Sequence, residues 1–214
     1  MAHVFRATVS RAGSLSKSGS TCGINLGTLM PINSRADYEE YLAADLAAHG
    51  VEKFTLWHRL SRPTLRYQRR LRYIEYLTNC KSGPVWKTYL LFQRWRLQRM
   101  GVLLGFDISP NCFGPGLHIV HWGTIMVART VRVGARCSIM PSTSIAASDL
   151  GAPTLGDDVY VGPGAKLVGN ITIGDRTTIG ANAFVCSSQP ADTTLAAPQA
   201  RAFPRRPPGT PRPE

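Results

Sequence analysis

The chain has 214 residues and a formal net charge of +12, from 25 Lys and Arg residues against 13 Asp and Glu residues. This length allows one domain or one and a half, with an ample apolar core. No run of 18 apolar residues occurs, so we predict no transmembrane helix, and membrane contact is not the interpretation we favour. The positive charge suggests an anionic partner. The candidates are nucleic acid, an anionic membrane surface and a phosphorylated cofactor, and the lack of a nucleic-acid motif argues against the first.

The cysteines are five in number and scattered along the sequence, at Cys22, Cys80, Cys112, Cys137 and Cys186. No pair has the spacing of metal ligands, so we predict no metal site. An odd, scattered set is typical of reduced thiols in a cytoplasmic protein, which is the location we expect.

The N-terminal part divides into an extension and a helical domain. Residues 1–30 contain no acidic residue and are rich in Ser, Gly and Thr. This composition resembles a transit peptide but lacks an amphipathic face, so we expect a flexible extension. Ser34 followed by Asp37 predicts a capping box that opens a helix reaching to about Ala48.

Residues 53–100 predict further helices, broken at Pro63 and at residues 82–84. Arginines alternate there with Trp, Leu, Tyr and Phe side chains. We interpret these segments as amphipathic helices whose long Arg stems cover apolar surface. A basic, aromatic surface that rests on an anionic bilayer is the weaker alternative. The predicted helical domain covers residues 31–104.

A six-residue repeat follows the helices. Aliphatic residues recur at every sixth position from Leu155 to Val185, mostly followed by Gly and, four positions on, by a small residue. The same spacing runs upstream from Ile145 to Val127. This period fits neither a helix nor a lone strand, and it predicts a three-sided coil with one short strand for each hexapeptide. The step of ten between Ile145 and Leu155 predicts a loop at residues 146–154.

The predicted coil domain covers residues 105–186, beginning with a turn-rich segment at residues 105–116. The sequence beyond it, residues 187–214, is rich in Pro and Arg and predicts an extended or disordered tail. The fold class is therefore α+β, with an N-terminal helical domain followed by a parallel β-coil.

His121 is the best candidate for chemistry on this scaffold. One repeat before Val127, it occupies a position where an aliphatic residue is expected, and His118 lies three residues earlier. Histidine titrates near neutral pH and can take a proton from an alcohol. A structural histidine is the alternative that the spacing leaves open.

The segments GPGLHIVHWGTIMV at 114–127 and GDDVYVGPGAKLVGNITIGDRTTIGANAFV at 156–185 resemble the serine O-acetyltransferase family. Within that family, the chain is most similar to the shorter branch found in polysaccharide and amino-acid clusters. The resemblance implies a left-handed parallel β-helix, acetyl-CoA as co-substrate and a homotrimer or a dimer of trimers. It also implies that His121 is the general base, and that the acceptor alkoxide attacks the thioester directly.

The resemblance also assigns binding residues. Asp45, within AADLAAHG, matches an acid that holds the amino group of serine, and we add His118 and Asp157 as candidate acceptor-binding residues. The residues that match the edge binding CoA are Gly162, Pro163, Gly164, Ala165, Lys166, Gly180 and Ala181. The chain departs from the family at three polar positions, which are Val120, Met140 and Ala152 here.

Three functions remain open from the sequence. The first is acetyl transfer from acetyl-CoA to L-serine, giving O-acetylserine for cysteine biosynthesis. The second is the same reaction on a sugar or another small alcohol, which the missing polar positions favour. The third is a coil that has lost its active site and serves as a scaffold.

Overall fold

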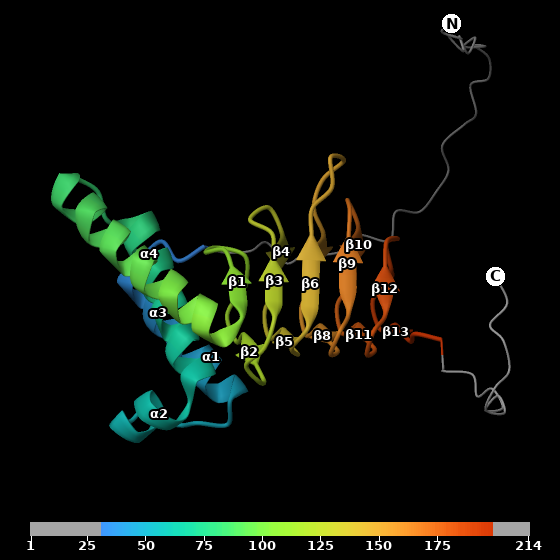
Figure 1. The fold of residues 1–214 in the computed structure, drawn as a ribbon, viewed down its shortest axis with the longest axis horizontal. Coiled ribbons are helices and arrows are strands. Elements are labelled where there is room, and N and C mark those ends of the chain that lie inside the picture. The colour runs from blue at the N-terminus through green and yellow to red at the C-terminus, as the bar shows by residue number, and fades with distance from the viewer. Residues whose placement is uncertain (1–30, 199–214) are drawn as a thin grey trace, which may run out of the picture.

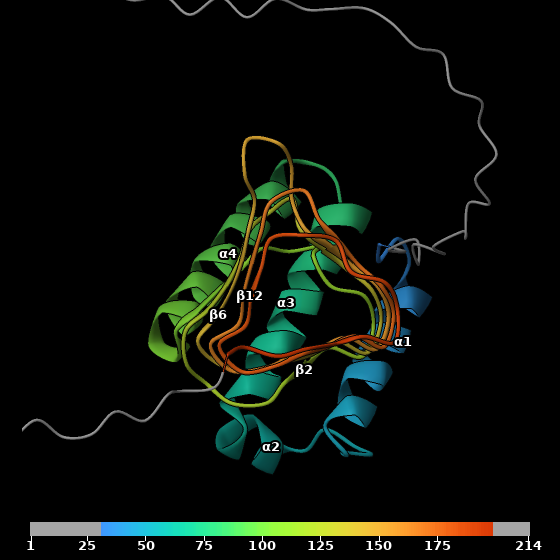
Figure 2. The same ribbon diagram turned by 90° about the vertical axis from the view of Figure 1, so that its right-hand side faces the viewer.

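The computed structural model describes residues 31–198, where four helices adjoin one end of a three-sided parallel β-coil (Figure 1). Viewed along its axis, the coil is triangular (Figure 2), as the six-residue period predicts. The predicted extension at residues 1–30 and residues 199–214 of the predicted tail lie outside the described residues. Among the four helices, none combines the length and apolar composition that a bilayer-spanning segment requires.

The helices begin and end where the sequence signals predict. Ser34 caps the first helix and forms a capping box with Asp37. Pro63 and Pro84 open the third and fourth helices, and Gly105 ends the fourth in a left-handed conformation. The bounds are α1 Arg35–Ala48, α2 Leu56–Ser61, α3 Pro63–Cys80 and α4 Pro84–Leu104.

The coil consists of short parallel strands that stack into three sheets. One sheet has the strand order β1-β3-β6-β9-β12, the second β10-β7-β4 and the third β13-β11-β8-β5-β2. The bounds are β1 Phe106–Ile108, β2 His118–Ile119, β3 Ile125–Val127, β4 Arg132–Val133, β5 Ser138–Ile139, β6 Thr143–Ala146, β7 Thr154–Leu155, β8 Tyr160–Val161, β9 Lys166–Val168, β10 Thr172–Ile173, β11 Thr178–Ile179, β12 Phe184–Val185 and β13 Thr194–Leu195.

The core of the coil is made of the residues that carry the repeat. Every predicted aliphatic anchor from Val127 to Val185 is at most 5% exposed. The small residues four positions on are also buried, among them Val131, Cys137 and Ala165. Stacking identical strands in register buries these side chains as continuous internal columns, which no single coil turn can do alone. The predicted loop after Ile145 projects from the coil above β6 (Figure 1).

The coil extends past its predicted end, and its predicted turn-rich start contains a strand. At the start, β1, within residues 105–116, pairs with β3. At its end, β13 pairs with β11, so the predicted tail from residue 187 begins inside the coil. The repeat count missed β13 because the step from Val185 to Leu195 is ten residues rather than six.

A buried ionic network joins the helices to the first coil turn. Arg72 of α3 is fully buried and pairs with Asp45 of α1, at 2.9 Å, and with Glu75, at 3.0 Å. Its guanidinium also donates to the carbonyl oxygens of Phe113, at 2.8 Å, and Gly114, at 2.6 Å. The network therefore fixes α1, α3 and the start of the coil relative to one another.

Candidate active site

His121 lies on the outside of the coil, at the corner that joins β2 to β3, and its side chain is exposed. The internal column at this level is filled by Ile119, which pairs with Ile139 of the next turn. Ile119 and Val127 are eight residues apart, two more than the repeat, and His121 lies within this enlarged corner. The six-residue count assigned His121 to an interior position, and the two extra residues explain why it faces solvent.

The backbone on both sides of His121 is held by hydrogen bonds. Val120 N–H donates to Ile139 O at 3.3 Å, and Gly123 N–H donates to Leu104 O, at the end of α4, at 2.9 Å. Gly123 has a φ of 141°, and a Cβ built on it would lie 2.8 Å from the Cβ of Pro141. This position therefore requires glycine, both for its backbone conformation and for its close approach to the next turn.

The predicted CoA-binding residues lie in higher corners of the same coil edge as His121. This edge joins the sheet of β2, β5, β8 and β11 to the sheet of β3, β6, β9 and β12. Its successive corners are bonded through the backbone, because Gly164 N–H donates to Pro141 O at 3.1 Å and Asn182 N–H donates to Pro163 O at 2.8 Å. The structure thus brings the candidate base and the glycine-rich corners together on one edge, which we call the histidine edge.

The residues of these corners differ in what they present to solvent. Pro163, Lys166 and Ala181 are exposed. Ala165 is fully buried, and its backbone amide and carbonyl are both bonded within the coil, to Gly162 O and Ser144 N. A ligand on this edge would therefore meet the exposed residues and the glycine backbone rather than Ala165.

His118 points outward from β2 and contacts the helical domain. Its ring meets the ring of His49, at the C-terminal cap of α1, edge to face with centroids 4.6 Å apart. His49 Nε2 lies 2.7 Å from Gln68 Oε1, and Gln68 Nε2 donates to the carbonyl oxygen of Leu117. Ser138 Oγ lies 3.5 Å from His118 Nδ1. His118 is thus held between α1, α3 and the second coil turn.

Burial lowers the pKa of both partly buried histidines. For His118, desolvation lowers the pKa most, and the positive charges of His49 and His121 lower it further. For His49, desolvation lowers the pKa more than its bond to Gln68 and the charge of Asp45 raise it. Both rings are therefore biased toward the neutral form.

Asp45, the predicted ligand of the serine amino group, is 1% exposed and lies inside the molecule. Its Oδ2 accepts from Arg72, and its Oδ1 accepts from Gly116 N–H at 3.0 Å and Leu117 N–H at 2.9 Å. The carboxylate thus positions the backbone immediately before His118. Direct binding of an acceptor by Asp45 stays a prediction, and it would require Asp45 to leave this network.

Asp157 lies on another edge of the coil, at the corner between β7 and β8. Its Oδ1 accepts from Ala135 N–H at 2.8 Å, so it ties two coil turns together. The loop carboxylate Asp149 lies at the third edge, between β6 and β7. Within one chain, the structure therefore does not bring either acid to His121, and a role for Asp157 in acceptor binding stays a prediction.

Sequence reasoning did not single out His49 and Gln68. Neither residue belongs to the repeat, and His49 is 69 positions from His118 in the chain. Both residues belong to the segments predicted as amphipathic helices or their ends. That pattern alone does not indicate which side chains contact the coil.

The histidine edge is suited to proton transfer beside an extended ligand. An exposed imidazole can accept a proton from an alcohol, and the exposed Lys166 can attract a phosphate group. In residues 31–198, no group of three or more His, Cys, Asp or Glu side chains is arranged to hold a metal ion.

The coil also matches known protein sequences. Residues 152–187 match the bacterial transferase hexapeptide family, described as six repeats. The chain is 34% identical over 99 residues to a serine acetyltransferase of Synechococcus elongatus, covering 44% of this chain and 41% of that protein. It is 33% identical over 106 residues to a serine acetyltransferase of Helicobacter pylori, covering 47% of this chain and 62% of that protein. The chain thus spans less than two thirds of the length of these relatives.

Solved structures extend the likeness to the helical domain. A serine acetyltransferase in complex with CoA is 27% identical with a TM-score of 0.61, over 78% of this chain and 70% of that one. The Neisseria gonorrhoeae serine acetyltransferase in complex with serine has a TM-score of 0.61 at 24% identity, over 80% of this chain and 71% of that one, a likeness that shows the fold alone.

Fold and repeats together define a left-handed parallel β-helix built from hexapeptide repeats. In sequence and in structure, the chain is similar to serine acetyltransferases, the family that its sequence motifs resemble.

Proposed function

We propose that the protein transfers the acetyl group of acetyl-CoA to the hydroxyl group of L-serine. The observation that carries this proposal is the histidine edge, where exposed His121 shares one coil edge with the glycine-rich corners. The likeness to serine acetyltransferases, one of them in complex with CoA, supports the choice of substrates.

In this reaction His121 is the general base. Its imidazole takes the proton of the serine hydroxyl, and the resulting alkoxide attacks the thioester carbonyl. The C–S bond then breaks, and the imidazolium gives its proton to the departing thiolate, so CoA leaves as the thiol. Gly164 is required by the coil itself, because a Cβ there would collide with Asn182 Oδ1 of the next turn. Lys166 attracts the CoA phosphates.

The test is release of free thiol from acetyl-CoA in the presence of L-serine. We expect His121→Ala to lower kcat about 10²–10⁴-fold, the range of a general base. The matched control is His58→Ala, which removes a histidine from α2, outside the coil. Unchanged thiol release by His121→Ala would show that another group is the base. Acetyl-CoA that raises the melting temperature without any turnover would instead favour the scaffold function.

A sugar or another small alcohol is the second candidate acceptor. The loop between β6 and β7, residues 147–153, contains no cation, whereas binding the carboxylate of serine favours one. A panel of sugars in the same thiol-release assay separates the two acceptors, since only the sugar hypothesis expects turnover with the panel and none with serine.

We further propose that the active protein is a homotrimer or a dimer of trimers, with each site between neighbouring copies. The separation of His121 and Asp157 on different edges of one chain supports this, because a second copy can present its Asp157 edge to the histidine edge. Mixing inactive His121→Ala with inactive Asp157→Asn chains should then restore part of the activity. Light scattering provides the oligomeric state, and a monomer that retains activity would exclude this arrangement.

The proposed location is the cytoplasm. The four described cysteines are free thiols, which accords with a reducing compartment.

A further inference from the structure

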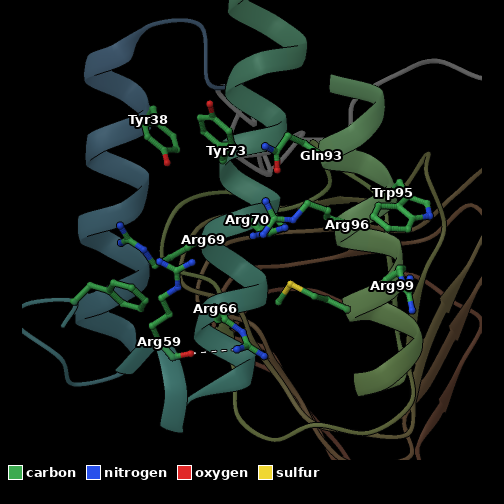
Figure 3. A pocket seen from close by; sticks show the side chains of 12 residues that line it. Tyr38, Arg59, Arg66, Arg69, Arg70, Tyr73, Gln93, Trp95, Arg96 and Arg99 are labelled. Atoms are coloured by element: carbon green, nitrogen blue, oxygen red, sulfur yellow. Dashed lines mark hydrogen bonds between the residues drawn. The ribbon is translucent and has the colours of Figure 1, made fainter. Parts of the chain in front are cut away.

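The helical domain contains a cavity that is lined by none of the residues of the coil. It has a volume of about 610 Å³ and lies between α1, α3 and α4 (Figure 3). Its lining is basic and aromatic and includes no carboxylate. The arginines that line it are Arg59, Arg66, Arg69, Arg70, Arg96 and Arg99. We call this site the arginine pocket.

The positive charge of the described chain is concentrated around this pocket. Residues 31–104 contain thirteen Lys and Arg residues against six Asp and Glu residues, whereas residues 105–198 contain five against six. Two of the six helical acids, Asp45 and Glu75, are already paired with buried Arg72. Helix α4 carries four cations and no acid. The helical domain therefore has an excess of positive charge, whereas positive and negative charges nearly balance in the coil.

None of the six pocket arginines forms an ion pair with a described residue, in contrast to Arg136 and Arg176, which pair with aspartates on the coil. Arg66 donates through Nη1 to the carbonyl oxygen of Arg59 at 3.3 Å, but its buried Nε has no hydrogen-bond partner among the described residues. A buried, unpaired N–H group is costly. Because this nitrogen is shielded from solvent, an anion in the pocket would reach it only after the Arg66 side chain turns.

Like charges face one another across the pocket. Arg70 of α3 and Arg96 of α4 point toward each other (Figure 3). Desolvation lowers the pKa of Arg70 most, and the charges of Arg96, Arg59 and Arg66 lower it further. Arg stems that only cover apolar surface would gain from separating their charged heads in water. Convergence of the heads is instead what a multiply charged anion requires.

Aromatic rings hold several of these guanidinium groups by their faces. Arg69 lies over the ring of Phe54, with 4.2 Å from Cζ to the ring centroid, and Arg99 lies over Trp95 at 5.1 Å. A cation–π contact uses the flat face of the guanidinium group and leaves its N–H edge available. The N–H edges form the bidentate contacts that phosphate oxygens accept.

We propose that the arginine pocket binds a phosphate-bearing ligand with at least two negative charges. A phosphate group can accept hydrogen bonds from several clustered guanidinium N–H groups, and its negative charge offsets their excess positive charge. The group can come from a soluble phosphorylated molecule or from a phospholipid headgroup, and the experiment distinguishes these sources. The pocket is separate from the histidine edge, so its occupancy does not depend on acetyl transfer.

The experiment measures binding of inorganic pyrophosphate to the full chain by calorimetry, with saturating CoA present to occupy the coil site. We expect binding that the double variant Arg70→Gln/Arg96→Gln weakens about tenfold or more, because two charge-assisted contacts are lost. The control is Arg94→Gln, which removes one positive charge from α4, the helix of Arg96, at a residue that does not line this pocket. Its affinity should stay within about twofold of the wild type.

A second arm measures co-sedimentation with phosphatidylcholine vesicles, with and without phosphatidylglycerol. Binding to the anionic vesicles alone, lost in the double variant, would support the proposal and assign the phosphate to a lipid. Absence of binding to both probes would overturn it, as would binding that the double variant retains. Because Arg70 and Arg96 repel each other, we expect the ligand-free double variant to melt no lower than the wild type. Loss of binding would then not reflect unfolding.

Discussion

At Gly123, in the corner that presents His121, there is no room for a side chain. Its φ of 141° lies outside the range that side chains favour, and Pro141 occupies the space that a Cβ would need. The corner and the next coil turn are therefore in direct contact at this residue. The position of the imidazole depends on this packing as well as on the local sequence.

We predict that Gly123→Ala lowers both stability and acetyl transfer. The strained backbone and the collision together should cost about 1–3 kcal/mol, and the resulting shift of the corner displaces His121. Urea unfolding and the thiol-release assay provide the two measurements. The control is Gly50→Ala, which has a φ of 64° but no atom within 4 Å of the added Cβ. If both variants lose the same stability and neither loses activity, Pro141 does not constrain the corner.

The histidine pair at the junction of helices and coil predicts a pH dependence of stability. Burial lowers the folded-state pKa of His49 and His118 below the ordinary value. The unfolded chain therefore binds more protons below about pH 6.5, so the free energy of unfolding falls as the pH drops through that value.

Urea unfolding at about pH 7.5 and about pH 5.5 measures this difference. We expect the variant His49→Gln/His118→Gln to lose less stability between these values than the wild type does. An equal loss in both proteins would assign the acid sensitivity to other groups.

At the scale of elements, Arg72 does most to join the helices to the coil. Its guanidinium bonds to α1 through Asp45, to Glu75 on its own helix and to two carbonyl groups before β2. Burial alone would lower the pKa of Arg72, but the charges of Asp45 and Glu75 raise it above the ordinary value. The guanidinium therefore stays charged and compensates both acids.

We predict that Arg72→Met lowers the free energy of unfolding by about 3–5 kcal/mol, because it leaves buried carboxylates without their partner. The control is Arg176→Met, which removes a solvent-exposed partner of Asp192 and should cost far less, because solvent screens an exposed ion pair. Chemical denaturation of both variants measures the contrast. Similar losses would show that burial does not distinguish the two pairs.

For the whole molecule, stability depends on stacking successive coil turns. Strand β13 closes the described end of the coil by pairing with β11, and Leu195 packs against the core. Each turn contacts only its neighbours, so removing the last strand exposes the turn beneath it.

We predict that a chain ending at Cys186 melts several degrees below a chain ending at Pro198, on the order of 2–8 °C. Thermal unfolding followed by circular dichroism measures the difference. The chain ending at Pro198 is the matched control, since it retains β13. Equal melting temperatures would mean that β13 adds nothing to the stack.

The sequence by itself determined the architecture, because a six-residue period of aliphatic residues can be buried only by a stacked three-sided coil. The capping box at Ser34 and the breaks at Pro63 and Pro84 likewise predicted helices, since these signals act over a few residues. The sequence also indicated His121 through its family motif, although the repeat count assigned it to an interior position.

Only the tertiary structure decided which side chains meet. It turned His121 outward through two extra residues in one corner, placed Asp157 on another edge and buried Asp45 against Arg72. It also gathered arginines from separate helices around one pocket. A periodic pattern fixes which residues face the core, but contacts between distant segments depend on how helices and coil pack, and no local signal in the sequence encodes that packing.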